Sequence, residues 1–563
     1  MKAITLSTAG IGLLLLTPCA VVHAAEPPRL VLQITVDALR GDLPERYSEH
    51  YGEGGFRYLM EKGIHFANAN YQHANTETIV GHSSLATGSV PAGHGMVANV
   101  WFDRELDRLV YNIEDANYAL LSKDADVDQN TEIDPTQKTA KVEGRSPNSI
   151  LVSTFSDEIV AHYAGKSKAF AVSVKDRGAV SLAGHSGKAF WFSKAAGEFV
   201  TSTYYYDKYP QWVLDFNSEG RAQQYADTEW TLMDTADNYL FGDRDNQPYE
   251  TDFPGFGRTF PHPYGNDKYT TTRLTLSPVG DELTLAFAQR LVDEESLGQD
   301  TIPDYLSISF SSTDYVNHMF GPSSLEAEDN LRRLDRTLAQ LFSFVDDRVG
   351  LDNTSIVLSA DHGSPDIPGY VNDLGNQTAF DFDLDAIQRG PIVEALQRQF
   401  GVGEALIDTW FHPYLYLNKA VIAEHGLDQA EVEAAVATQL ETIPGVAQAI
   451  SSTALRAGRV ADTLLTQSVK HNFHPKRSGD IYVVMTPNVF VTDFDGLTVA
   501  SVHGSLWRYD TFVPIYFAGY GVEENAKVMR PVQPYDIAPT LAAMLGIKAP
   551  SGAVGQALPE VLD

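Results

Sequence analysis

Three short apolar segments, each followed within a few residues by an aspartate, constrain the fold of this chain more than any other feature. Amphipathic helical patterns lie between the later segments, over residues 277–297 and from Pro322 onwards. Strands that alternate with helices predict an α/β fold with a mostly parallel central sheet sandwiched by helices. In such sheets the chemistry lies at the carboxyl ends of the strands. The segments are residues 30–36, 305–310 and 354–359, and the aspartates are Asp37, Asp314 and Asp361.

The alternation of strands and helices holds over only part of the 563 residues. A chain of this length buries a large core, in one domain with insertions or in two domains. We expect residues 25–363 and 481–563 to form the main catalytic domain. Residues of about 201–268 lack a clear period and are expected to form an irregular insertion near the mouth of the site. We expect 364–480 to form a small α+β auxiliary or cap subdomain.

Residues 1–24 have the pattern of a cleavable signal peptide. Lys2 supplies the positive charge, residues 11–16 form a short apolar run, and Ala24 ends a small-residue cleavage site. The run is too short to span a membrane, and no later segment is apolar for long enough. The single cysteine, Cys19, lies inside this segment, and the preceding Pro18 argues against a lipoprotein cleavage site. We therefore expect a periplasmic or secreted protein without disulfide bonds.

The formal net charge of −33, from 41 basic and 74 acidic side chains, limits the partners of the chain. Nucleic-acid-binding proteins present positive surfaces, so this charge argues against nucleic acid as a partner. It fits an exported, soluble protein. An anionic substrate would need local positive charge, and bound metal cations are the obvious source. The sequence does not set the oligomeric state, and a monomer agrees with it.

Histidines near the segment-end aspartates predict a metal site. His318 follows Asp314 by four residues, His362 follows Asp361 directly, and His503 is a third candidate. Mixed carboxylate and imidazole ligands suit Zn²⁺ or a similar transition metal. Two sites with three protein ligands each would leave positions open for substrate, as in two-metal enzymes. The alternative is that these aspartates are helix caps and that the histidines, among 16 in the chain, are ordinary surface or core groups.

The stretch 75–88 reads as a loop that runs into a short helix, with Thr78 at the helix start. The unpaired N–H groups and the dipole of a helix N-terminus favour an anion. A hydroxyl there becomes a nucleophile most readily beside a metal ion. Threonine is also a common helix cap, so Thr78 alone would not identify a site.

Together these residues resemble the alkaline phosphatase superfamily. The resemblance is to the branch of nucleotide pyrophosphatase/phosphodiesterases and PafA-type bacterial alkaline phosphatases, and it covers about residues 29 to 550. It implies two zinc ions per chain and a phospho-threonine that forms when Thr78 attacks phosphorus and is then hydrolysed. The matching patterns are Asp37, Thr78-x-x-Gly81-His82, Asp314-x-x-x-His318, Asp361-His362-Gly363 and His503-Gly504. The implied ligands are Asp37, Thr78, Asp361 and His362 for one zinc, and Asp314, His318 and His503 for the other.

Three further residues, Asn99, Lys175 and Arg177, resemble the substrate-binding residues of the PafA-type monoesterases. A monoester is a dianion, so extra donors and cations at its free oxygens favour its hydrolysis. Val80 stands where the phosphodiesterases usually have proline, which also favours the phosphatase branch. The alternative for Lys175 and Arg177 is a solvated edge pair. Asp176 between them is expected to be a surface residue or a supporting partner.

The sequence therefore predicts an exported, zinc-dependent alkaline phosphatase that acts on small phosphate monoesters and releases inorganic phosphate. One alternative is a type I phosphodiesterase/nucleotide pyrophosphatase of the same superfamily. Another is a catalytically inactive binding scaffold. A sulfatase is disfavoured, because position 78 is threonine and lacks a Cys/Ser-x-Pro-x-Arg context.

Overall fold

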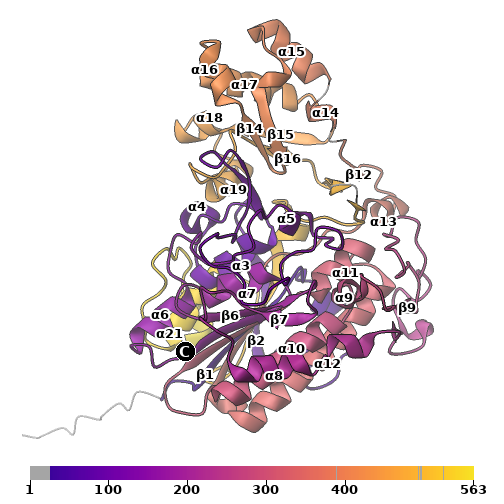
Figure 1. Ribbon diagram of the computed structural model, residues 1–563, viewed down its shortest axis with the longest axis vertical. Coiled ribbons are helices and arrows are strands. Elements are labelled where there is room, and N and C mark those ends of the chain that lie inside the picture. Colours follow the sequence, from indigo (N-terminus) through magenta and orange to yellow (C-terminus); the bar gives the residue numbers. More distant parts are fainter. Residues whose placement is uncertain are drawn as a thin grey trace, which may run out of the picture.

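Strand β1 (Leu30–Val36) lies inside a nine-stranded sheet, and all seven of its residues are buried. Such a strand needs cover on both faces of the sheet. Helix α7 (Asp176–Ala183) packs on β5 (Ala169–Ser173), and α10 (Val279–Glu295) packs on β5 and β10 (Asp304–Phe310). These helices lie on opposite sides of the sheet (Figure 1). The predicted α/β class is confirmed.

The computed structural model describes residues 26–383, 385–388, 390–491, 493–494, 497–523 and 525–562. The expected signal peptide, residues 1–24, lies outside this range. None of the described helices is long and apolar enough to cross a membrane.

The register of the central strands brings their carboxyl ends to one edge. Strand β1 pairs in parallel with β10 on one side and with β11 (Thr354–Ser359) on the other, and β10 pairs in parallel with β5. The sheet is mixed towards its edges, because β20 (Phe512–Gly519) runs antiparallel to β11. The strand order is β21-β2-β20-β11-β1-β10-β5-β6-β7, and the remaining strands are β2 (Gly63–Asn70), β6 (Lys188–Ser193), β7 (Glu198–Val200) and β21 (Ala526–Val528).

Helix α12 (Leu325–Arg348) is the amphipathic helix predicted from Pro322 onwards. Its cap is Ser324, whose side chain accepts a hydrogen bond from the Ala327 N–H, so the helix begins after the expected Pro322. The face with leucine at helical spacing is buried. Other helices that cover the sheet or carry site residues are α2 (Phe56–Lys62), α3 (Thr78–Thr87), α6 (Phe155–His162), α11 (Ser312–Phe320) and α21 (Ile537–Met544).

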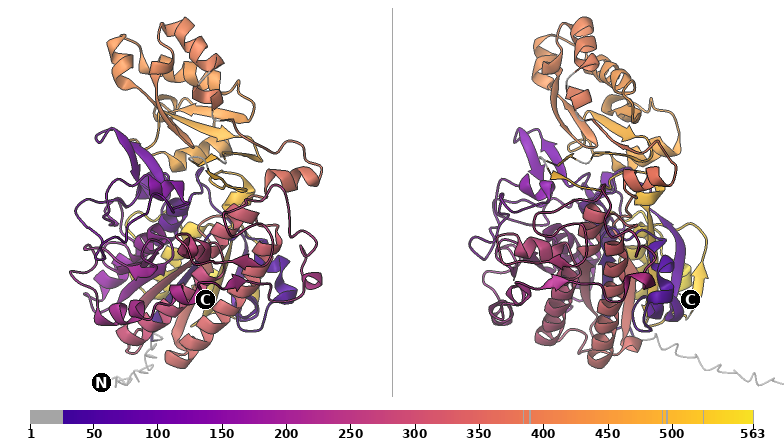
Figure 2. Two further views of the ribbon diagram at one scale, coloured as in Figure 1. Left: turned by 45° about the vertical axis from the view of Figure 1, so that its right-hand side comes forward. Right: turned by 90° about the vertical axis from the view of Figure 1, so that its right-hand side faces the viewer.

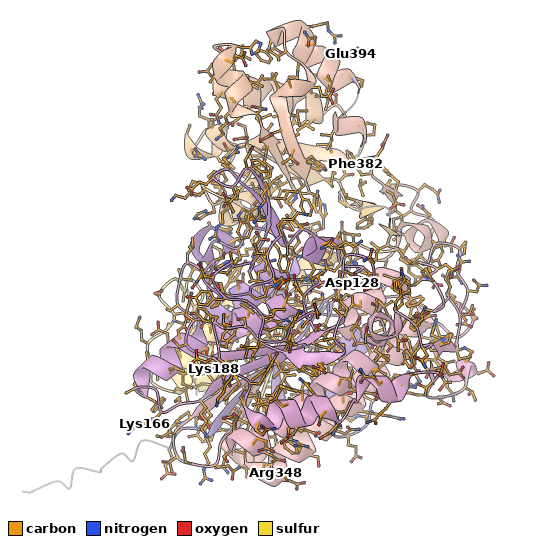
Figure 3. The ribbon with its side chains drawn as sticks, viewed as in Figure 1. Asp128, Lys166, Lys188, Arg348, Phe382 and Glu394 are labelled. Atoms are coloured by element: carbon orange, nitrogen blue, oxygen red, sulfur yellow. The ribbon has the colours of Figure 1, made fainter. Side chains whose placement is uncertain are left out.

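A second hydrophobic core lies in a lobe at one end of the molecule (Figure 2). Its four-stranded sheet has the order β13-β14-β16-β15, and Phe382 and Glu394 mark this lobe in Figure 3. Strand β16 belongs to this sheet although it follows residue 480, so the expected boundary there is wrong. The elements are β13 (Ile407–Phe411), β14 (Tyr414–Leu417), β15 (Val446–Ser451), β16 (Ile481–Met485), α15 (Pro391–Phe400), α16 (Lys419–Glu424) and α17 (Gln429–Leu440).

The insertion at 201–268 contains one regular helix, α8 (Gln211–Ser218), and otherwise short elements. It is attached to the helical layer: Trp212 Nε1 donates to Glu295 on α10 at 2.9 Å, and Trp230 Nε1 donates to Asp329 on α12 at 2.7 Å.

Candidate active site

The three strand-end aspartates meet at one edge of the main sheet. Asp37 follows β1 directly, Asp361 lies two residues beyond β11, and Asp314 is in the first turn of α11, which follows β10. All three are buried. His362 Nε2 lies 3.4 Å from Asp37 Oδ1 and 3.3 Å from Asp361 Oδ2. Asp37, Asp361 and His362 form the first ligand cluster.

The second cluster contains Asp314, His318 and His503. His318 Nε2 lies 3.3 Å from Asp314 Oδ2, and His503 Nε2 lies 3.4 Å from Asp314 Oδ1. The rings of His362 and His503 stack with centroids 3.6 Å apart, so the two clusters adjoin. Asp314 is also within metal-ligand reach of Asp37 and His362. The structure thus brings the six predicted aspartate and histidine ligands together, but proximity alone does not divide them into the two predicted sets.

The three histidines are oriented alike. Each Nδ1 donates to a backbone carbonyl: His318 to Ser501 at 2.7 Å, His362 to Gly363 at 2.8 Å, and His503 to Thr76 at 2.9 Å. A carbonyl only accepts, so Nδ1 carries the proton and the Nε2 lone pair faces the cluster. This is the arrangement that metal-binding histidines adopt.

The donor set fits a metal ion by its chemistry. Among the described residues, Asp37 Oδ1, Asp314 Oδ1 and His362 Nε2 are buried without a hydrogen-bond partner. Burial lowers the pKa of His362 and His503, which favours the neutral, ligating form. Burial and the Asp361 carboxylate raise the pKa of Asp37 well above its usual range, so this group lacks sufficient positive charge nearby. Mixed Asp and His ligands suit zinc.

Thr78 is placed beside the first cluster by the start of α3. Its predecessor Glu77 is the N-cap residue and gives no side-chain cap, so capping does not account for Thr78. A Cβ on Gly81 would lie 1.9 Å from the carbonyl oxygen of Asp361, so only glycine lets α3 approach this closely. His82 Nδ1 lies 3.0 Å from Asp361 Oδ2 and orients that carboxylate.

Lys175 and Arg177 flank the start of α7 and are 1% and 3% exposed, so the solvated edge pair is excluded. The Lys175 ammonium lies 2.7 Å from Asp37 Oδ2 and also contacts Asp314, between the two clusters. Burial lowers the pKa of Lys175, but these two carboxylates outweigh it and raise the pKa above its usual value. Arg177 Nη2 donates to Thr78 Oγ1 at 3.3 Å.

Asn99 contacts the first turn of α3 from the other side. The Asn99 side-chain Oδ1 accepts from the Ile79 backbone N–H at 3.1 Å, and the Asn99 backbone N–H donates to the Glu77 carboxylate. Burial raises the pKa of Glu77 to about 7. Of the three predicted substrate-binding residues, Arg177 contacts Thr78, Asn99 contacts its neighbours Glu77 and Ile79, and Lys175 lies between the two ligand clusters.

Two further acidic residues lie beside Arg177: Asp176 takes one of its two expected roles, and Asp134 was not expected. Asp176 is a buried supporting residue rather than a surface one, since it accepts from Arg145 Nε at 2.8 Å and Tyr111 OH at 2.6 Å. Asp134 was not predicted: its Oδ2 lies 2.7 Å from Arg177 Nη1. The only local signal was an aspartate before Pro135, which is typical of a helix start.

A cavity opens beside these residues. One side is polar and includes Glu77, while Ile133, Met319 and Val502 contribute an apolar side. The insertion at 201–268 is not among the residues that line this cavity, and its position near the mouth stays a prediction. It contacts the lining at Met319, whose carbonyl accepts from the Thr251 N–H at 2.8 Å. The lining also includes Asn99, Asp134, Pro135, Thr136, Arg177, Asp314, Tyr315, His318, Val499 and His503.

Comparison with known proteins identifies the family of this chain. The model of the family described as type I phosphodiesterase / nucleotide pyrophosphatase matches residues 31–506. The chain belongs to this family. Alkaline phosphatase PhoV of Synechococcus elongatus is 32% identical over 549 residues, which are 95% of this chain and 93% of that protein. Alkaline phosphatase PafA of Elizabethkingia meningoseptica is 32% identical over 546 residues, 96% of this chain and 95% of that protein.

Solved structures support the membership. The crystal structure of wild-type PafA superimposes with a TM-score of 0.85 at 31% identity, and covers 96% of this chain and 100% of that chain. Murine ectonucleotide pyrophosphatase/phosphodiesterase 5 has a TM-score of 0.50 at 13% identity, over 92% of this chain and 95% of that chain, and shares the fold. The predicted resemblance to the alkaline phosphatase superfamily, and with it the prediction of an enzyme, is confirmed.

Proposed function

We propose that the protein is an exported, zinc-dependent alkaline phosphatase that hydrolyses phosphate monoesters through a phospho-threonine at Thr78. The observation that carries this proposal is the position of Thr78, beside a buried carboxylate and histidine cluster and within hydrogen-bond distance of the buried Arg177. The full-length relatives PhoV and PafA, both named alkaline phosphatases, support it.

The proposed ligand sets are those expected from the sequence. Asp37, Asp361 and His362 would hold one zinc ion with the Thr78 oxygen, and Asp314, His318 and His503 would hold the other. Zinc bound there supplies Lewis-acid chemistry that lowers the pKa of a hydroxyl and stabilises charge on oxygen.

The chain's own groups account for the rest of the proposed reaction. Thr78 Oγ1 forms a bond to phosphorus as the bond to the ester oxygen breaks, and the alcohol leaves. Arg177 Nη2 and the N-terminus of α3 favour the deprotonated form of Thr78. Water then hydrolyses the phospho-threonine, which releases inorganic phosphate and restores the hydroxyl.

The choice of monoester over diester rests on Asn99, Lys175 and Arg177. A monoester dianion has three non-bridging oxygens, whereas a diester is a monoanion with a second organic group. Arg177 Nε is buried and makes no hydrogen bond to any described residue, so it is a donor available to a substrate oxygen. A cation placed at developing charge in a buried site stabilises the transition state strongly. The alternative remains a type I phosphodiesterase.

Turnover of p-nitrophenyl phosphate and of bis-p-nitrophenyl phosphate tests the proposal. We expect a higher kcat/KM for the monoester, and a loss of about 100-fold or more in Arg177→Ala and Lys175→Ala that is much smaller for the diester. Monoester turnover that survives both substitutions would show that the monoesterase assignment is wrong. A purified protein that contains no zinc and stays inactive when zinc is added would instead support the inactive scaffold.

Export is tested separately. A full-length chain expressed in a Gram-negative host should appear in the periplasmic fraction without residues 1–24. A protein that keeps these residues and stays in the cytoplasm would contradict the proposed localisation.

A further inference from the structure

A segment that the catalytic proposal does not use passes beside the site. Residues 124–138, which we call the strap, end in the short helix α5 (Pro135–Lys138). Figures 1 and 3 place α5 and Asp128 between the main sheet and the end lobe. The strap residues 133–136 line the cavity beside Thr78.

Asp134 connects the strap to Arg177 through its two carboxylate oxygens. Oδ1 accepts from Thr136 N at 2.9 Å and from Thr136 Oγ1 at 2.6 Å, which fixes the carboxylate to the strap. Oδ2 accepts from Arg177 Nη1 at 2.7 Å. Asp134 is 8% exposed, so the pair is shielded from water. Burial raises the pKa of Asp134, but Arg177 and Lys194 outweigh it and hold the pKa well below the usual range.

The backbone beside Arg177 is held independently of Asp134. The neighbouring Asp176 accepts from Arg145, Tyr111 and Gln137 Nε2, the last at 3.2 Å. The base of the Arg177 side chain is therefore fixed. Its Nη1 donates to Asp134 at 2.7 Å and, over a longer distance, to Tyr111 OH at 3.5 Å. The shorter contact with Asp134 directs Nη2 towards Thr78 Oγ1, 3.3 Å away.

We infer that Asp134 is a positioning residue that gives the site its selectivity for phosphate monoesters, by holding the Arg177 guanidinium towards Thr78. This inference rests on the proposed function, since it needs Arg177 to meet a non-bridging oxygen of the substrate. A planar guanidinium discriminates by direction as well as charge. A phosphate diester presents less negative charge to Arg177 and therefore gains less from a correctly oriented guanidinium.

Two substitutions separate this role from support of the strap. Asp134→Ser keeps an oxygen that is favourable at a helix N-cap but does not reach Arg177. Asp134→Asn keeps the shape, but one amide cannot accept from both Arg177 and Thr136. We expect both variants to lower kcat/KM for p-nitrophenyl phosphate by about 10- to 100-fold, the usual cost of losing a supporting partner. The value for bis-p-nitrophenyl phosphate should change by less than about threefold.

Asp126→Asn is the matched control. Asp126 lies on the same strap and also pairs with an arginine, Arg145, at 2.9 Å. It does not line the cavity at Thr78. The ratio of the two kcat/KM values should therefore stay at the wild-type value. The inference is overturned if Asp134→Ser and Asp134→Asn leave the monoester-to-diester ratio unchanged. This holds whether the two kcat/KM values fall together or neither falls.

The variant Arg177→Ala distinguishes this failure from failure of the proposed function. If Arg177→Ala does not lower the monoester-to-diester ratio, the proposed function is wrong. If Arg177→Ala lowers the ratio and the Asp134 variants do not, only the role of Asp134 is overturned. When Asp134→Ser is added to Arg177→Ala, we expect no further fall in the ratio, because Asp134 acts through Arg177. A further fall would show that Asp134 acts by another route.

Discussion

The site has two halves that differ in how their polar groups find hydrogen-bond partners. The substrate half contains Asn99 and Arg177, and the ligand half contains the six proposed metal ligands Asp37, Asp314, His318, Asp361, His362 and His503. In the ligand half, buried atoms such as Asp37 Oδ1 and His362 Nε2 lack hydrogen-bond partners among the described residues. In the substrate half, Asp134 accepts from Arg177 Nη1 and the start of α3 holds Asn99, while Arg177 Nε has no partner among the described residues. A buried charge without a partner is costly. We therefore expect the ligand half to take up cations from solution, whereas contacts within the protein orient the substrate half.

The largest effect should come from removing Thr78, the proposed nucleophile. Thr78→Ala should lower monoester turnover by about 10,000-fold or more, the order found when a covalent nucleophile is removed. Zinc content should stay close to wild type, because the six other proposed ligands remain. Activity assays and elemental analysis of the purified variant measure the two effects.

A matched control lies on the same helix. Thr87 is buried, and its hydroxyl donates to the Ser83 carbonyl at 2.6 Å, near the other end of α3. Thr87→Ala should keep turnover within about tenfold of wild type. Comparable losses in both variants would indicate that the effect comes from the helix rather than from the nucleophile.

Removal of metal acts on the ligand half alone. A ligand that binds only the folded state stabilises it by about 4 kcal/mol at a free concentration 1,000 times its Kd. Chelation should lower the thermal midpoint by several degrees, since a loss of 1 kcal/mol shifts large domains by about 2–4 °C. Added zinc should restore it. A midpoint that is unchanged by exhaustive chelation would show that the ligand half is complete without metal.

Lys175 connects the halves, because its ammonium contacts Asp37 and Asp314. Lys175→Met should destabilise the chelated protein by about 3 kcal/mol, the cost of leaving buried carboxylates without a cation. Denaturant unfolding should show a smaller loss in the free energy of unfolding when the protein is loaded with zinc. Lys188→Met, on β6 and away from the ligands (Figure 3), should affect both forms equally. Equal losses in the Lys175 variant would contradict this connecting role.

The ligand half could be anticipated from the sequence, and much of the substrate half could not. Asp37 and Asp361 follow apolar strands, and neighbouring parallel strands end at the same edge, so local pattern is enough to place them. The contact of Asp134 with Arg177 spans 43 residues and starts from a strap without periodicity, so tertiary packing alone decides it.

The same limit applies to strand direction and to lobe boundaries. The hydrophobic pattern of β20 shows a buried strand but not that it runs antiparallel to β11. Strand β16 is as apolar as a main-sheet strand, and only its pairing with β14 and β15 assigns it to the end lobe. The individual site roles stay predictions that the variants above test.

The smallest expected effect concerns pH. Arg177 and Lys194 hold the pKa of Asp134 below its usual range despite burial, and Asp134 likewise holds the pKa of Arg177 above its usual value. A carboxyl group with a lowered pKa contributes stability that is complete above its unfolded pKa of about 4 and is lost only as the pH falls through the folded value. The Asp134–Arg177 pair therefore keeps its charges from about pH 5 to 9.

The substrate titrates in this range instead, with a second pKa of about 6 for a phosphate monoester. The proposed zinc ligands and Thr78 would act on both substrates, so their titration should cancel in the monoester-to-diester ratio of kcat/KM. We expect this ratio to be constant between about pH 8 and 9, above the pKa of about 7 of Glu77 beside Asn99. It should fall below about pH 6, where the monoester loses its second charge. Arg177→Ala should make this fall smaller, because the second charge of the monoester then lacks its arginine partner. A ratio that changes between pH 8 and 9 in the wild type would show that Arg177 or Asn99 is not held in one state by the protein.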